Sequence, residues 1–165
     1  MLMVDAYIGL GSNLNHPVEQ VRAALTALQA IPGSTLAAAS SLYRSDPMGP
    51  QDQDDYINAV ACLRTGLKPL QLLDHLQTIE QTHGRVRGER WGPRTLDLDL
   101  LTYGYETIDL PTLTVPHYGI AERSFVLLPL SEIAPEDFEI AGYGRLPPLL
   151  DALPRPLACE RIDTP

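Results

Sequence analysis

The order in which strand-like and helix-like segments follow one another most constrains this fold. Short apolar runs bounded by Gly, Pro or polar residues predict strands, and apolar residues at three- and four-residue spacing predict helices. Six such segments follow in order: a strand at Val4–Leu10, a helix that begins at Pro17, strands at Leu36–Tyr43 and Ile57–Leu63, a helix from Pro69 to His83, and a strand at Leu96–Tyr103.

This βαββαβ order predicts an α+β protein with a ferredoxin-like core, a mainly antiparallel sheet flanked by helices in three α/β/α layers. We expect Thr107–Asp109 to pair beside the last of these strands and a third helix at Ala121–Ile133, bent or broken near Pro129. The length of 165 residues predicts one domain, residues 1–165. Within it, residues 143–165 are expected to form a loosely packed, Pro-rich C-terminal segment.

Composition excludes several classes of protein. The net charge of −9 argues against a general nucleic-acid or anionic-membrane surface, and 44% hydrophobic residues argue against disorder. The first residues lack the basic start of a signal peptide and no stretch is long enough to span a membrane, so we expect a cytoplasmic protein. Cys62 and Cys159 match no metal or redox spacing and favour two reduced thiols, with a long-range disulfide as the alternative.

A pair of carboxylates on the last predicted strand is the strongest chemical signal. In this strand Leu96, Leu98 and Leu100 point to one face, and Asp97 and Asp99 point to the other. Carboxylates two residues apart on a strand stand side by side and can hold hard cations against a phosphate chain. A solvated face with ordinary acids is the alternative.

The segment before this strand concentrates positive charge. It contains four arginines within ten residues: Arg85, Arg87, Arg90 and Arg94. Arginines that clamp phosphoryl oxygens beside metal-binding carboxylates are typical of phosphoryl transfer. A solvated basic loop that pairs with the protein's excess acid is the alternative. No Walker-type phosphate loop is present in the sequence, so arginine and metal would have to hold any nucleotide.

Aromatic and amide side chains form a second group of candidates. Tyr56 and Phe125 could sandwich a flat heterocycle, while Asn58 could bind its edge, although the residues alone favour a core tyrosine, a core phenylalanine and a turn asparagine. His117 and Tyr118 could bind a nucleotide or occupy an ordinary turn. Trp91 is the only tryptophan and lies in a polar Gly/Pro-rich segment, which favours a ligand-facing role.

Four sequence runs carry a resemblance to a known family. They are YIGLGSNL at residues 7–14, GPQDQDDYINA at 49–59, RWGPRTLDLDLLTYG at 90–104, and LTVPHYGIAERSFVLLPLSEIAPE at 113–136. On these motifs the chain resembles the 6-hydroxymethyl-7,8-dihydropterin pyrophosphokinases (HPPK) of folate biosynthesis. The resemblance implies transfer of pyrophosphate from ATP to the hydroxymethyl group of the pterin, with release of AMP and with two Mg²⁺ ions on the triphosphate.

The resemblance also assigns roles to individual residues. Asp97 and Asp99 would bind the metals and, with Arg85 and Arg94, serve catalysis. The ATP side would comprise Gln77, Glu80, Arg87, Trp91, Arg94, His117, Tyr118 and Arg123. The pterin side would comprise Ser45, Met48, Tyr56, Asn58 and Phe125. The turn of Gly11, Ser12 and Asn13 is expected to support the pterin pocket. The partners implied are small molecules, and we expect a monomer.

Three departures from the familiar pattern bear on the site. Asp46 stands where Pro or Thr-Pro is frequent, Thr112 stands where an arginine is common, and the segment VRGERWG is one residue shorter than usual. Two other functions are compatible with part of this pattern. A metal-dependent nucleotide-sugar transferase could use the same Asp-x-Asp pair, but 165 residues leave little room for two binding halves. A non-catalytic pterin sensor would need neither the carboxylate pair nor the arginine segment.

Overall fold

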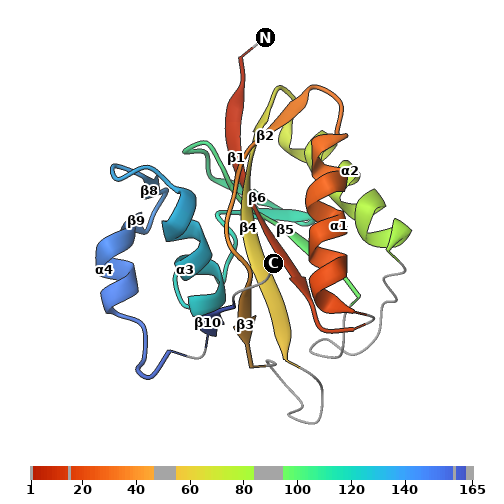
Figure 1. Cartoon of the computed structure of the whole chain (residues 1–165). Helices are drawn as coiled ribbons and strands as arrows, with labels where there is room; N and C mark the ends of the chain where they lie inside the picture. Colours follow the sequence, from red (N-terminus) through yellow and green to blue (C-terminus); the bar gives the residue numbers. More distant parts are fainter. Residues whose placement is uncertain (1, 15, 47–54, 84–94, 158, 163–165) are drawn as a thin grey trace.

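An antiparallel sheet forms the centre of the computed structural model (Figure 1), which describes residues 2–14, 16–46, 55–83, 95–157 and 159–162. Its strands run in the order β10–β3–β4–β1–β5, and β2 also pairs with β4. The sheet strands are β1 (Val4–Ser12), β2 (Ser34–Ala39), β3 (Tyr43–Ser45), β4 (Tyr56–Thr65), β5 (Asp97–Tyr103) and β10 (Cys159–Arg161). Two small hairpins lie outside it, β6 (Ile108–Leu110) with β7 (Leu113–Val115) and β8 (Glu139–Ile140) with β9 (Gly144–Arg145).

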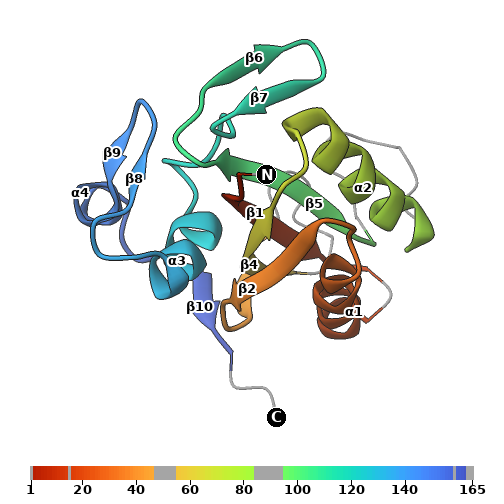
Figure 2. The same cartoon turned by 90° about the horizontal axis from the view of Figure 1, so that it is seen from above.

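Helices cover both faces of this sheet. In Figure 2, α1 (Pro17–Gln29) and α2 (Pro69–Thr82) lie on one face, and α3 (Ser124–Ile133) and α4 (Leu146–Asp151) lie on the other. Each face has its own apolar cluster, centred on residues such as Ile8, Leu28 and Leu76 on the first and on Leu127 and Leu130 on the second. The predicted three-layer α+β fold is therefore confirmed.

Local sequence explains why the first two helices begin where they do. Pro17 and Pro69 occupy first-turn positions, where a missing N–H costs no helical hydrogen bond. At the start of α2, the Lys68 N–H donates to Gln71 Oε1 at 2.9 Å. In α1, residues at three- and four-residue spacing, Val21, Ala24 and Leu28, are buried against the sheet.

The strand predicted at Leu36–Tyr43 is wrong in one respect, because the structure divides it into β2 and β3. Two serines occupy the break: Ser40 Oγ accepts the Val60 N–H at 2.9 Å, and the Ser41 N–H donates to the Glu132 carboxylate at 2.9 Å. The Ser40 N–H still donates to Val60 O at 2.8 Å, but the Ser40 hydroxyl and a distant carboxylate accept the two other N–H groups in place of main-chain carbonyls.

Two other predicted elements also differ. Residues 107–109 do not pair with β5, because β6 pairs with β7 and the His117 N–H donates to Leu101 O at 2.9 Å. The third helix begins at Ser124 rather than Ala121, and it continues through Pro129 to Ile133.

The C-terminal segment contributes side chains to the apolar core and a strand to the central sheet. Leu146 and Leu153, from the segment expected to be loosely packed, are buried, and β10 pairs with β3. Cys62 and Cys159 are both buried free thiols. None of the described helices is long and apolar enough to cross a bilayer.

Candidate functional site

The sheet register brings the predicted carboxylates and amide onto one face. In one row across the strands, Asn58 of β4 pairs with Gly11 of β1, which pairs with Asp97 of β5. Two residues further along these strands, Gly9 of β1 pairs with Asp99 of β5. Because directly paired residues project from the same side of a sheet, Asn58 and both carboxylates face the same way. The leucines that alternate with the carboxylates, Leu96, Leu98 and Leu100, belong to the apolar cluster on the opposite face, as their alternation predicts.

Two glycines make the floor of this face hollow. A Cβ atom at Gly11 would lie 3.3 Å from Asn58 Oδ1, and one at Gly9 would lie 3.4 Å from a methyl carbon of Leu101. Any side chain here would therefore fill the space between the amide and the carboxylates. The sequence carried only part of this signal, because Gly9 lies in the predicted strand Val4–Leu10, whereas Gly11 was expected in the turn that follows. That expectation is wrong, since β1 continues through Gly11 to Ser12.

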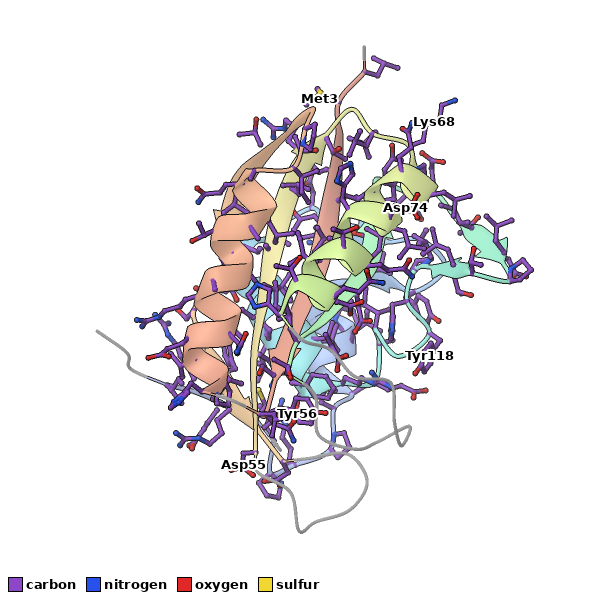
Figure 3. All side chains as sticks on the ribbon, turned by 90° about the vertical axis from the view of Figure 1, so that its right-hand side faces the viewer. Met3, Asp55, Tyr56, Lys68, Asp74 and Tyr118 are labelled. Atoms are coloured by element: carbon purple, nitrogen blue, oxygen red, sulfur yellow. The ribbon has the colours of Figure 1, made fainter. Side chains whose placement is uncertain are left out.

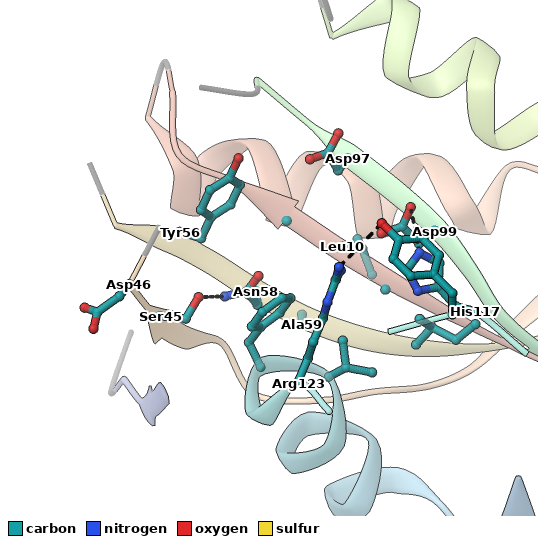
Figure 4. A pocket seen from close by; sticks show the side chains of 16 residues that line it. Leu10, Ser45, Asp46, Tyr56, Asn58, Ala59, Asp97, Asp99, His117 and Arg123 are labelled. Atoms are coloured by element: carbon teal, nitrogen blue, oxygen red, sulfur yellow. Dashed lines mark hydrogen bonds and ion pairs between the residues drawn. The ribbon is translucent and has the colours of Figure 1, made fainter. Parts of the chain in front are cut away.

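The hollow is an open cavity of about 200 Å³ at the end of the sheet (Figure 4). Figure 3 shows Tyr56 near this end, far from Met3 and Lys68 at the other. The lining residues come from β1, β3, β4, β5, α3 and the segment before α3: Gly9, Leu10, Gly11, Ser45, Asp46, Tyr56, Asn58, Ala59, Asp97, Asp99, Leu101, His117, Tyr118, Arg123, Phe125 and Val126.

A buried hydrogen bond orients the amide at one end of the cavity. Asn58 Nδ2 donates to Ser45 Oγ at 2.7 Å, and both residues are 4% exposed. With its amino group bonded to the neighbouring strand, Asn58 presents its carbonyl oxygen on the Gly11 side. This end of the cavity therefore offers an acceptor to a flat ligand with N–H groups on its edge.

A neutral histidine stands beside the carboxylates at the other end. His117 Nδ1 accepts the Gly119 N–H at 3.2 Å, and Nε2 lies 4.0 Å from Asp99 Oδ1. Burial, and secondly the positive charge of Arg123, lower the pKa of His117 to about 4. The Asp99 carboxylate would oppose this shift, but it is half exposed and its field is screened by water. At neutral pH, His117 is therefore uncharged and carries its proton on Nε2, the nitrogen nearer Asp99.

Arg123 provides a cation in the described part of the cavity wall. Its guanidinium lies 5.2 Å from the ring centre of Tyr118 and 5.7 Å from that of Phe125. The absence of a side chain at Gly119 leaves room for this guanidinium, because a Cβ atom there would lie only 2.5 Å from Arg123 Nε. The cavity thus presents carboxylates, a guanidinium and aromatic rings together.

A second hollow, of about 250 Å³, adjoins the first. It lies between α2, β5 and β7 and shares Asp99, His117 and Tyr118 with the cavity. Its remaining lining is mostly apolar: Leu73, Leu98, Leu100, Pro111, Thr112, Leu113 and Thr114. Asp99, His117 and Tyr118 therefore stand at the junction of the two hollows.

Comparison with known proteins identifies the family. Residues 7–135 match the model of 7,8-dihydro-6-hydroxymethylpterin-pyrophosphokinase (HPPK). The chain belongs to this family. It is 54% identical over 148 residues to the 2-amino-4-hydroxy-6-hydroxymethyldihydropteridine pyrophosphokinase of Pseudomonas aeruginosa, covering 90% of this chain and 91% of that protein. It is 58% identical over 132 residues to the Haemophilus influenzae enzyme of the same name, covering 80% of this chain and 82% of that one.

Solved structures agree on the fold. A crystal structure of an HPPK-DHPS in complex with substrates superposes with a TM-score of 0.73 at 12% identity, covering 92% of this chain and 43% of that chain. Wild-type Plasmodium falciparum HPPK-DHPS with pteroate gives a TM-score of 0.71 at 14% identity, covering 91% and 42%. The chain thus spans less than half of the length of these longer HPPK-DHPS chains.

Most of the described residues that the HPPK resemblance singled out line the cavity. They are Ser45, Tyr56, Asn58, Asp97, Asp99, His117, Tyr118, Arg123 and Phe125. Two residues given an ATP-side role line neither hollow: Gln77 is exposed on α2, and Glu80 is buried, with its Oε2 accepting the Leu98 N–H at 2.8 Å. Ser12 and Asn13, expected to support the pterin pocket, are buried and line neither hollow. Met48, Arg85, Arg87, Trp91 and Arg94 lie outside the described residues.

The structure also adds residues that sequence reasoning did not assign to the HPPK site. Leu10, Ala59, Leu101 and Val126 line the cavity, yet in sequence they are ordinary apolar members of strands and a helix. Two of the departures noted in the sequence do reach the hollows, since Asp46 lines the cavity and Thr112 lines the second hollow.

Proposed function

We propose that the cavity above Gly9 and Gly11 binds 6-hydroxymethyl-7,8-dihydropterin and that Asp97 and Asp99 hold the metal-bound phosphates of ATP beside it. The enzyme transfers pyrophosphate to the pterin hydroxymethyl group in folate biosynthesis, as its family membership establishes. The observation that carries the site assignment is the single row of the sheet that joins the Asn58 amide, Gly11 and the Asp97 carboxylate.

The pterin end has the chemistry that a flat, N–H-bearing ring requires. The carbonyl oxygen of Asn58 would accept from the ring edge, while its amino group stays bonded to Ser45. Tyr56 of β4 and Phe125 of α3 line the same space from different layers, and their rings would cover the two faces of the pterin. We assign Met48 to the pterin side on the strength of the family resemblance.

The carboxylates fit a magnesium site. Asp97 and Asp99 supply hard oxygen donors on one face of β5, at the positions two residues apart that place Cα atoms about 7 Å from each other. Mg²⁺ is usually held by one or two carboxylates together with waters and substrate phosphates. Two such ions would neutralise charge on the triphosphate, and the two aspartates would hold them.

The second hollow would take the nucleoside of ATP. It opens at Asp99, so a nucleotide with its base among Leu73, Leu98 and Leu100 would direct its phosphates toward the carboxylates. His117 and Tyr118 would line its path, and Arg123 would meet phosphate oxygens. We place Gln77, Glu80, Arg85, Arg87, Trp91 and Arg94 on this ATP side on the strength of the family resemblance.

The reaction that follows is an in-line displacement. The pterin hydroxymethyl oxygen attacks the β-phosphorus of ATP and loses its proton to solvent, the bond between the β-phosphorus and the bridging oxygen of the α-phosphate breaks, and AMP leaves with that oxygen. The protein contributes chiefly position and electrostatic complementarity, which dominate catalysis of phosphoryl transfer. A neutral His117 suits this arrangement, since its Nε2–H can donate to a carboxylate or phosphate oxygen without adding a charge.

A product assay tests this function directly. The protein is incubated with the reduced hydroxymethylpterin, ATP and Mg²⁺, and the nucleotide products are separated. We expect AMP and the pterin diphosphate in equal amounts, with none formed in excess EDTA. ADP as the product would contradict pyrophosphoryl transfer, and pterin binding without turnover would favour a sensor.

A further inference from the structure

The last strand of the chain pairs with a strand of the candidate site. The family match ends at residue 135, but β10 (Cys159–Arg161) lies beyond it and forms an antiparallel ladder with β3. The ladder pairs Cys159 with Ser45 and Arg161 with Tyr43, and the Ile162 N–H donates to Leu42 O at 3.0 Å. A segment about 115 residues away in sequence thus lies directly against Ser45.

This pairing changes the position of β3 within the sheet. β3 has only three residues and pairs with β4 on one side. Without β10 it would be a short edge strand, and a strand this short has few hydrogen bonds to keep its register. With β10 in place, both edges of β3 are paired.

Strand β3 ends at a residue that makes a hydrogen bond in the wall of the cavity. Ser45, the last residue of β3, lines the cavity, and its hydroxyl accepts the Asn58 Nδ2–H at 2.7 Å. A small shift of β3 would lengthen this bond and release the amide that faces Gly11. The route from β10 to the pterin end therefore passes through one backbone ladder and one side-chain hydrogen bond.

Backbone pairing and burial, rather than charge, hold β10 in place. The Arg44–Glu160 ion pair is 3.6 Å long, and its side chains are 49% and 72% exposed, so it contributes little. Cys159 is buried, and Ile162 packs against the apolar core that includes Leu42.

We propose that β10 is a positioning strap for the pterin end of the cavity, which fixes Ser45 and thereby the orientation of the Asn58 amide. This inference rests on the proposed function, because it takes the pterin to bind at Asn58. It assigns a role in substrate affinity to a segment outside the family match.

The alternation of a β ladder supplies a matched pair of variants. The Ile162 N–H points toward β3, so the Glu160 N–H points the same way and the Arg161 N–H points outward. Proline at residue 160 therefore removes a ladder hydrogen bond, whereas proline at residue 161 does not. Glu160→Ala removes only the exposed ion pair.

The experiment measures affinity for each substrate together with the docking of β10. For Glu160→Pro we expect the pterin Kd to rise at least tenfold while the KM for MgATP stays within about twofold. A thiol reagent should modify Cys159 without denaturant in this variant, while the buried Cys62 stays protected. Arg161→Pro and Glu160→Ala should match the wild type in both measurements. If Glu160→Pro does not fold, Ile162→Ser takes its place. This variant keeps the ladder N–H but loses apolar packing, and we expect a smaller rise in the pterin Kd and in Cys159 reactivity.

Two results would overturn the inference while leaving the proposed function intact. One is a reactive Cys159 with an unchanged pterin Kd. The other is an equal loss of affinity for pterin and MgATP together with a lowered melting temperature, which would mean a general structural role. Failure of the wild-type protein to bind the pterin at all would instead overturn the proposed function, and this inference with it.

Discussion

The two faces of the central sheet are built from the same strands and each packs an apolar cluster, but the face toward α3 also opens into the candidate cavity. On the face covered by α1 and α2, strands β1, β4 and β5 present Ile8, Ala61 and Leu98 to an apolar core, and Leu98 also borders the second hollow at the edge of the sheet. On the face toward α3, the alternate residues of the same strands include Gly11, Asn58 and Asp97, which line an open cavity. A strand with a period of two can thus stabilise the fold with one set of residues and build a site with the other. Substitutions on the first face should change stability, and those on the second should change binding and catalysis.

Removal of a carboxylate on the open face should have the largest effect. Asp97→Asn and Asp99→Asn should each lower turnover by at least about a hundredfold, because a metal ligand is lost where charge on the phosphates must be neutralised. The pterin Kd should change less than about threefold, since the pterin end is built from other residues. Single-turnover formation of AMP measures the first effect, and pterin binding measures the second.

The control is Asp74→Asn on the exposed side of α2, which should behave as wild type. Turnover within threefold of wild type in either cavity variant would contradict the metal-binding role.

A deletion on the face covered by α1 and α2 should act on stability alone. Leu76 of α2 is fully buried, and Leu76→Ala should lower the free energy of unfolding by about 2–5 kcal/mol through lost burial and the cavity left behind. Urea unfolding gives this free energy, and steady-state kinetics at a temperature where the variant is folded should show both KM values within about twofold. A large rise in either KM would show that the two faces are coupled.

Addition of a methyl group to the floor of the cavity should weaken pterin binding with little change in stability. At Gly11 the new Cβ meets Asn58 Oδ1 at 3.3 Å, so Gly11→Ala should raise the pterin Kd by about 10- to 100-fold, a cost of about 1–3 kcal/mol. Gly9→Ala is the matched comparison, because its Cβ meets the flexible end of Leu101 and should cost less. An equal or larger effect at Gly9 would mean that the amide side is not the pterin end.

The smallest effect expected is at the contact between α3 and the break in the strand. Burial raises the pKa of Glu132. Hydrogen bonds from the Ser41 N–H, the Tyr43 hydroxyl and the Ser41 hydroxyl together lower the pKa by more than burial raises it, so that the net pKa lies below its usual 4.5. This carboxylate therefore stabilises the fold above pH 4.5, and the stabilisation is lost as the pH falls through the lowered pKa.

Because the site is exposed, Glu132→Gln should cost only about 0.5–1 kcal/mol at pH 7. Chemical unfolding at pH 7 and pH 3.5 should show that the difference between wild type and variant shrinks at the lower pH. Glu139→Gln, an exposed position on β8, serves as the control and should show no such convergence. A constant difference across this range would argue against the ionised Glu132 as the source.

The parts of the fold and site that were predictable depend on local patterns. Apolar spacing located α1, α2, β1, β4 and β5 to within a few residues, and alternation placed Asp97 and Asp99 on the face opposite the leucines. The family motifs then named nine of the residues that line the cavity. These signals survive in sequence because each depends on neighbours only a few positions apart.

What the sequence determined by itself is therefore the order of elements, the chemistry of the strand that carries the carboxylates, and the family. Only the tertiary structure decided that Ser40 and Ser41 divide a predicted strand, that β10 returns to cover β3, and that Glu80 bonds to the Leu98 amide. Each of these depends on hydrogen-bond partners far apart in the chain, from 18 residues for Glu80 and Leu98 to 120 residues for Leu42 and Ile162. Almost every residue offers the same backbone N–H and C=O groups, so the sequence does not show which distant groups will pair. The packing of the layers decides this pairing.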